Sequence, residues 1–363
     1  MQGLLREGLG TGKGRYNADL PVVIRQVCKI WLKLKALPET FWPDLDGDGA
    51  RINARAAAMR DIVRKGKLVN FATDEQAAIS RLFSSGVVRE LARSGRSPLF
   101  ARLVAQSQIL RLMSLSDRVC TVFETAFSLL KREGYRHEYI YKSALTHKIL
   151  LGRHSLQTAS MINEFRVGDC KADVAILNGT ATVYEVKSER DSLARLERQI
   201  AAYATVFAKV YVIAAESHIR GVVDTVPDYV GILCLNGRDQ ISTLRDAVDQ
   251  PERTSPGAIF DSIRTEEARL ILTSLGVSVP RVPNTELYAV LRDAFVKLDP
   301  IKAQEGMVSI LKRTRNLLPL SALIDQLPRS LQTAALSIPL RRADHDRLVA
   351  AVNTHLETAM AWG

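Results

Sequence analysis

One short stretch of this chain constrains the fold more than any other. The segment "KADVAILNGTATVYEVKSE" contains two apolar runs that meet at Asn178-Gly179. Asn-Gly between two apolar runs is a strong signal for a tight β-hairpin. Each predicted strand carries a carboxylate, Asp173 or Glu185, where a buried strand favours an apolar residue. We therefore predict an antiparallel pair of strands that holds acidic groups for a chemical purpose.

The segments around the hairpin predict a mixed α/β domain over residues 138–240. The apolar spacing favours a helix, then a strand before the hairpin, then a second helix and two more apolar runs. These segments are, in order, "EYIYKSALTHKILLG", "ASMINEFRVG", "SLARLERQIAAYATVFA", "KVYVIAAE" and "YVGILCLNG". Such an order is typical of a mixed sheet flanked by helices.

The regions outside this domain are predicted to be helical. Residues 1–55 form an N-terminal extension that is partly helical, and residues 56–137 form a basic helical region. The polar segment "NGRDQISTLRDAVDQPERTSPGA" is interpreted as a loop that ends the α/β domain. Residues 256–363 are predicted to form a small all-α domain.

The positive charge is concentrated near the start of the chain. The net charge is +11, and residues 1–153 alone contain 26 Lys and Arg against 14 Asp and Glu, a surplus of 12. Such a surplus favours a polyanionic partner. Arg89, Arg93 and Arg96 are therefore candidate contacts to a nucleic-acid backbone, and a solvated helix face is the alternative.

The hairpin brings polar groups together at one place. Strand alternation puts Glu185 and Lys187 on one face, and the short turn sets Asp173 at nearly the same level. Two buried carboxylates need compensation, and one Lys neutralises only one of them. Mg²⁺ prefers oxygen ligands, so Asp173 and Glu185 with the Val186 carbonyl form a candidate metal site. Lys187 is then free to act on a metal-bound water.

The pattern of an Asp, a strand and then Glu-x-Lys resembles the PD-(D/E)XK nuclease superfamily, which has a restriction-endonuclease-like fold. Asp173, Glu185 and Lys187 match the motif, with Ala172 in place of its Pro. The following helix resembles the Gln-x-x-x-Tyr variant of this superfamily at Gln199 and Tyr203. Within the superfamily, this segment resembles an uncharacterised group of bacterial nuclease-like proteins.

The resemblance implies a Mg²⁺-dependent endonuclease that hydrolyses phosphodiester bonds, with Mn²⁺ as a substitute metal and DNA favoured over RNA. Asp173, Glu185, Val186 and Glu164 would hold the metal, and Lys187 would assist the nucleophile. Gln199 would belong to the catalytic set, while Arg195 and Tyr203 would contact nucleic acid. A homodimer and a setting in phage defence, mobile-element biology or repair also follow from the resemblance alone.

Simpler interpretations of the same residues stay open at this point. Glu185 and Lys187 could pair on a solvated face, and Glu164 could pair with Arg166 or Lys171. Gln199 and Tyr203 could be ordinary packing residues of a helix. The corresponding alternatives for function are a non-catalytic nucleic-acid-binding protein that retains the fold, or a helical adaptor.

Two further features bear on location. No run of about 18 apolar residues is present, which predicts a protein with no membrane span. The four cysteines (Cys28, Cys120, Cys170, Cys234) are widely separated and form no CxxC motif. Such cysteines are typical of free thiols in a reducing compartment, so we expect a cytoplasmic protein.

Overall fold

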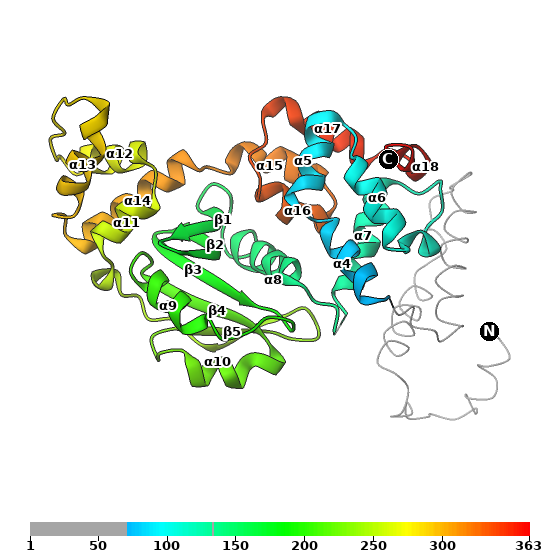
Figure 1. Ribbon diagram of the computed structural model, residues 1–363, viewed down its shortest axis with the longest axis horizontal. Helices are drawn as coiled ribbons and strands as arrows, with labels where there is room; N and C mark the ends of the chain where they lie inside the picture. The colour runs from blue at the N-terminus through cyan, green and yellow to red at the C-terminus, as the bar shows by residue number, and fades with distance from the viewer. Residues whose placement is uncertain (1–70, 133) are drawn as a thin grey trace, which may run out of the picture. The chain divides into compact units, whose positions relative to one another are not determined.

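The computed structural model describes residues 71–132 and 134–363 (Figure 1). The predictions for residues 1–55, and for the first part of 56–137, lie outside the described residues. Residues Phe71–Gly363 form one compact unit. Within the described part of the chain, none of the helices has both the length and the apolar character needed to cross a membrane.

A mixed six-stranded sheet lies at the centre of this unit. Its strands are adjacent in the order of the sequence, with β1, β2 and β3 antiparallel, β3, β4 and β5 parallel, and β6 antiparallel to β5. The strands are β1 (Ser160–Val167), β2 (Cys170–Asn178), β3 (Thr180–Lys187), β4 (Lys209–Ala215), β5 (Gly231–Leu235) and β6 (Ile241–Arg245). The predicted mixed sheet flanked by helices is confirmed.

The predicted hairpin is also confirmed. Asn178 pairs with Thr180 across the turn, and Gly179 has a φ of 70°. This left-handed backbone conformation favours glycine, which explains the Asn-Gly signal. The prediction of a loop after β5 is wrong, because "ISTLR" forms the edge strand β6. Most of this strand is exposed, so its polar composition concealed it.

Three helices pack directly on the strands of the sheet. Helix α8 (Glu138–Leu145) continues as a π-helical turn, η3 (Thr146–Leu150), and contacts β3. Helix α9 (Leu196–Ala204) packs on β2 and β4, and α10 (Ile219–Thr225) packs on β4 and β5. Helix α9 therefore connects β3 to β4, and α10 connects β4 to β5, as the crossovers between parallel strands require.

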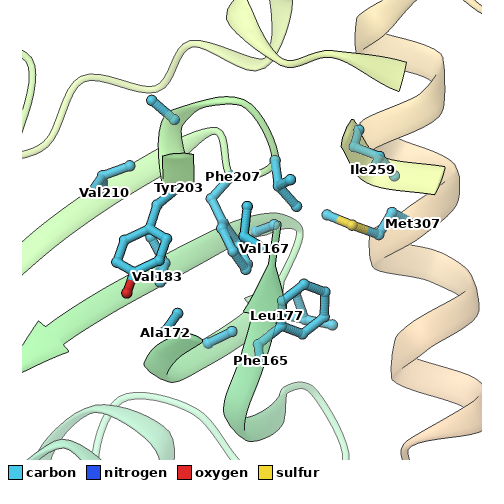
Figure 2. Close-up of a cluster of buried hydrophobic side chains, with 14 of the residues drawn as sticks. Phe165, Val167, Ala172, Leu177, Val183, Tyr203, Phe207, Val210, Ile259 and Met307 are labelled. Carbon is cyan, nitrogen blue, oxygen red and sulfur yellow. The ribbon is translucent and has the colours of Figure 1, made fainter. Parts of the chain in front are cut away.

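One face of the sheet carries an extensive apolar cluster of the core (Figure 2). Phe165 packs edge-on against Phe207 with 5.2 Å between ring centroids. Alternate strand residues such as Val183 and Val210 meet α9 there, and Met307 of α14 joins from the far side of the cluster. The helices of this layer after β6 are α11 (Pro256–Ser262), α12 (Thr265–Ser274), α13 (Asn284–Phe295) and α14 (Pro300–Thr314).

The remaining helices come from both ends of the described chain. Four precede the sheet: α4 (Thr73–Arg81), α5 (Ser85–Ser94), α6 (Pro98–Gln106) and α7 (Val119–Leu130). Four follow α14: α15 (Ser321–Gln326), α16 (Arg329–Leu336), α17 (Arg342–Val352) and α18 (Leu356–Met360). Short 3₁₀ turns occur at η2 (Ile109–Leu112), η4 (Glu216–His218), η5 (Pro251–Arg253) and η6 (Leu318–Leu320).

These two sets of helices pack on each other. Helix α17 contacts α5, and α16 contacts α7. The Leu356 N–H donates to the Asp117 carbonyl at 2.7 Å, which joins the two segments at the backbone. The region 256–363 is all-α as predicted, but its helices pack in two places. Helices α11 and α14 pack on the sheet, and α12 and α13 pack on those two helices, whereas α15–α18 complete the helical group begun by α4–α7.

Candidate functional site

The candidate site lies where β2 and β3 separate. The two strands pair from Asn178↔Thr180 to Val174↔Tyr184 and then diverge. At the divergence, Oδ2 of Asp173 accepts a hydrogen bond from the Val186 N–H at 2.8 Å. The carboxylate thus takes the place of a strand carbonyl and leaves its second oxygen free to meet other groups. The Asp173 side chain is only 18% exposed.

The side chains of β1 change from one face of the sheet to the other at this same level. Met161 packs against η3 on the α8 side of the sheet, whereas Phe165 packs in the core cluster on the opposite side. Residues four apart on a regular strand share a face, so the strand must change face between them. The change falls at Glu164, whose φ of 58° is uncommon for a residue other than glycine. Strained backbone of this kind is concentrated at functional sites.

Three carboxylates converge beside this turning point. One oxygen from each of Glu138, Glu164 and Asp173 lies within 4.8 Å of the other two. Glu138 begins α8 and is absent from the sequence prediction. Its only signal was an acid at the start of the predicted helix, with Lys142 four residues later on the same face.

The Lys142 ammonium lies among these acids. Its Nζ is 2.9 Å from Glu164 Oε1 and 3.9 Å from Asp173 Oδ1, and it also pairs with Glu138. Burial opposes a charge on Lys142, but Glu138 and Asp173 outweigh this and raise its pKa. For Glu164, burial is likewise outweighed by hydrogen bonds from Lys142 and Lys171, which lower its pKa. The cluster therefore attracts a cation.

Asp173 has the most unusual ionisation in the site. Burial, together with the nearby charges of Glu185 and Glu138, raises the pKa of Asp173 to about 8. Lys142 and the Val186 N–H act in the opposite direction and are too weak to reverse the shift. The carboxylates outnumber the ammonium groups by one, because Lys142, Lys171 and Lys187 are the ammonium groups that pair with Glu138, Glu164, Asp173 and Glu185.

The second half of the site is a buried polar network around Glu185. Glu185 Oε1 accepts from Lys187 Nζ at 2.9 Å and from Gln199 Nε2 at 2.5 Å, while Oε2 accepts from the Tyr203 hydroxyl at 2.9 Å. Gln199 Oε1 also accepts from Lys187 at 2.9 Å. Glu185 and Lys187 are 3% and 5% exposed. An ion pair on a solvated face is therefore the wrong interpretation of Glu185 and Lys187.

Tyr203 has a role different from the predicted one. The prediction that it contacts nucleic acid does not fit the structure, because its side chain is completely buried. Its hydroxyl contacts Glu185 and the Lys171 carbonyl, the latter at 3.0 Å (Figure 2 shows the ring pointing into the core). Burial and Glu185 raise the pKa of Tyr203, so the hydroxyl stays protonated and positions Glu185.

We expect Tyr203→Phe to lower the free energy of unfolding by about 1.5–3 kcal/mol, the usual worth of a hydrogen bond to a charged group. Urea denaturation followed by circular dichroism measures this change. Tyr288→Phe is the matched control, because Tyr288 is 51% exposed and its hydroxyl contacts Asp261 in solvent. Equal stability of the two variants would show that the Tyr203 hydroxyl does not hold Glu185.

The other predicted residues lie outside this network. Arg195 is exposed at the start of α9, and Arg93 and Arg96 are exposed in and after α5. Arg89 is half-buried on α5. Val186 is buried at 3% exposure, with its N–H engaged by Asp173. Glu164 does pair with Lys171, as the simpler interpretation of the sequence allowed, and with Lys142 as well.

The donor set suits a hard divalent cation. Glu138, Glu164 and Asp173 offer carboxylate oxygens, which Mg²⁺ and Mn²⁺ prefer, and the raised pKa of Asp173 reflects its burial and then the nearby charges of Glu185 and Glu138. Glu185 fits less directly, because both of its oxygens already accept hydrogen bonds. The predicted metal ligands Asp173 and Glu164 lie together, whereas Glu185 would have to release Lys187 to join them.

The sheet and its polar cluster define a mixed α/β protein with a carboxylate-rich site at a strand divergence. The chain belongs to the family described as bacteriophage P4 protein cII, whose model matches residues 131–312, half of the chain. This segment contains the whole sheet and the site.

Two individual proteins are similar to parts of the chain. Protein cII of Enterobacteria phage P4 is 33% identical over 98 residues, which are 26% of this chain and 33% of that protein. The similar segment thus spans about a third of that relative. The SPO1766 protein of unknown function from Silicibacter pomeroyi has a TM-score of 0.24 at 18% identity, covering 33% of this chain and 81% of that one. This score is too low to indicate a shared fold.

Proposed function

We propose that the protein is a Mg²⁺-dependent nuclease that hydrolyses phosphodiester bonds of DNA, with a restriction-endonuclease-like core. The observation that carries the proposal is the meeting of Asp173 with Glu185 and Lys187 where β2 and β3 separate. Asp173 is held by the Val186 N–H, and its pKa is raised to about 8 by burial and by Glu185 and Glu138. Perturbed carboxyl groups of this kind are typical of functional sites.

Each residue has a definite part in this proposal. Asp173 and Glu164, with Glu138 added from the structure, would hold Mg²⁺. When bound, this ion supplies charge neutralisation and lowers the pKa of water. Lys187 would orient the attacking water and donate hydrogen bonds to it. Gln199 holds the Lys187 ammonium and the Glu185 carboxylate together, since it contacts both.

The substrate side of the proposal depends on charge. Arg195 is exposed at the start of α9, the helix that carries Gln199, and would meet a phosphate of the strand to be cut. Similarity to a protein of phage P4 supports a phage-related setting, and a cytoplasmic location would suit such a setting. DNA is proposed over RNA on the resemblance to the PD-(D/E)XK superfamily.

The proposal predicts cleavage that needs a metal and Asp173. Purified protein is incubated with supercoiled plasmid and with circular single-stranded DNA, in Mg²⁺, Mn²⁺ or EDTA, and the nicked and linear products are quantified. Asp173→Asn keeps an acceptor for the Val186 N–H but removes the charge, so we expect a rate at least about 100-fold lower, equivalent to about 2.7 kcal/mol.

Asp169→Asn is the matched control for this assay. Asp169 lies four residues earlier, is 91% exposed and pairs with Arg198. It should cleave at the wild-type rate. Cleavage that persists in EDTA, or that survives in Asp173→Asn, would contradict the proposal.

A second candidate function is a nucleic-acid-binding protein that keeps this fold without catalysis. One observation favours it. Lys142 already lies among Glu138, Glu164 and Asp173, and Lys187 with its neighbours engages both oxygens of Glu185. A site in which lysines occupy the acids resembles a structural network. Salt-sensitive DNA binding with no cleavage in any metal would favour this function over the first.

A further inference from the structure

A second polar feature lies far from the catalytic candidates in the sequence. Helices α5 and α17 border a hollow of about 340 Å³ that is lined by Arg93, Arg341, Asp344 and Arg347. All four lining side chains are charged. Pockets for small organic ligands are mainly apolar with a few polar groups, so this hollow is suited to a different kind of ligand.

The hollow is built by contacts between the two helices. Arg347 Nε donates to the Ala92 carbonyl of α5 at 3.2 Å, and Arg347 Nη2 donates to Asp344 Oδ1 at 2.8 Å. Asp344 Oδ2 accepts from the Arg341 N–H at 2.9 Å, which closes the first turn of α17. These contacts hold Arg347 and Asp344 in place, and Arg93 and Arg341 complete the lining of the hollow.

The charge of the hollow is positive after internal pairing. Both Asp344 oxygens are engaged within α17, one by Arg347 and one by a backbone N–H. Three guanidinium groups face one carboxylate, and Arg93 and Arg341 are exposed. Guanidinium groups bind phosphate oxygens with paired, planar hydrogen bonds. The exposed guanidinium groups of Arg93 and Arg341 therefore suit the hollow to a phosphate.

We propose that this hollow binds a backbone phosphate of a nucleic acid, as a docking point separate from the catalytic candidates. The proposal rests on the proposed function in taking DNA as the polymer. The charge surplus of residues 1–153, which include α5, favours a polymer with repeated charges over a single small anion. The sequence alone does not indicate that α17 contributes to this hollow, because Arg341 and Arg347 lie about 250 residues after Arg93 in the chain.

Fluorescence anisotropy with a labelled 20-base-pair duplex and the matching single strand tests the proposal, using the full chain in EDTA so that cleavage plays no part. The variant Arg93→Gln/Arg341→Gln removes the two exposed guanidinium groups and leaves Arg347 and Asp344 in place. We expect affinity to fall about 10-fold at about 0.1 M salt and the slope of log affinity against log salt to weaken by about one.

Arg281→Gln/Arg313→Gln is the charge-matched control, because both arginines are exposed and lie outside the hollow. It should bind within about two-fold of the wild type. Equal losses in both variants would reveal an effect of net charge and overturn the proposal. A second outcome would also overturn it. If Arg93→Gln/Arg341→Gln bound DNA as the wild type does but was no longer stabilised against thermal unfolding by inorganic phosphate, the hollow would be a small-anion site.

The two proposals fail in different ways. A protein that cuts no DNA but loses affinity through Arg93→Gln/Arg341→Gln would refute the nuclease and keep the docking point. A protein that cuts DNA and binds it equally well with or without these arginines would do the reverse.

Discussion

Replacing Lys187 by methionine is expected to lower the free energy of unfolding by about 3–5 kcal/mol at neutral pH, the usual cost of leaving one member of a buried ion pair alone. Lys187 is 5% exposed and donates to Glu185, which is 3% exposed. Without the ammonium, Glu185 keeps only the hydrogen bonds of Gln199 and Tyr203. Urea denaturation followed by circular dichroism measures the change.

Two further variants make this result specific. Lys297→Met removes an ammonium that pairs with Asp293 in solvent, at 68% exposure, and should cost no more than about 0.5 kcal/mol. Glu185→Gln added to Lys187→Met removes the stranded charge and should restore most of the lost stability. A loss below about 1 kcal/mol for Lys187→Met would mean that water reaches Glu185 in solution, and the buried network would be refuted.

Asp173→Asn is expected to stabilise the protein, increasingly so as the pH rises from 4 to 8. The carboxyl group ionises near pH 4 in the unfolded chain and near pH 8 in the folded protein. Between these values the folded state binds more protons, so the stability contributed by protonated Asp173 is complete below pH 4 and is lost by about pH 8. The slope is at most about 1.4 kcal/mol per pH unit. Thermal unfolding of both proteins between pH 4 and pH 9 measures the difference.

Added Mg²⁺ should restore the stability that the wild type loses as the pH rises, and it should have no such effect on Asp173→Asn. A cation that binds ionised Asp173 adds about 2.7 kcal/mol of stability at 100 times its dissociation constant. The midpoint of thermal unfolding at pH 8 should therefore rise with Mg²⁺ in the wild type and stay constant in Asp173→Asn. A pH-independent gap between the two proteins would argue against the raised pKa. An equal Mg²⁺ response in both would place metal binding elsewhere.

The sequence predicted the elements of the site better than their contacts. The Asn-Gly turn and the strand alternation were enough to bring Asp173, Glu185 and Lys187 together, because these signals act over a few residues. Gln199 follows from its spacing to Tyr203 on one helix. Mixed α/β order likewise follows from local apolar periodicity.

What the sequence did not predict depends on long-range packing. Glu138 and Lys142 enter the site only because α8 lies against the sheet, and no local pattern reports that position. The change of face in β1 at Glu164 depends on a left-handed backbone at a residue type that rarely adopts one. Strand β6 is mostly exposed, so it lacks the apolar signal of a buried strand.

The packing of α17 on α5 has a consequence for how this chain can vary. The segment matched by the family model, residues 131–312, begins just after α7 and ends in the last turn of α14. The helices on either side of it therefore form one module made of two separate pieces of chain. Neither piece can bury its apolar face alone, so the loss of one exposes the other to water. Such a module must be gained, lost or replaced as a pair, and changes on α5 must be matched by changes on α17.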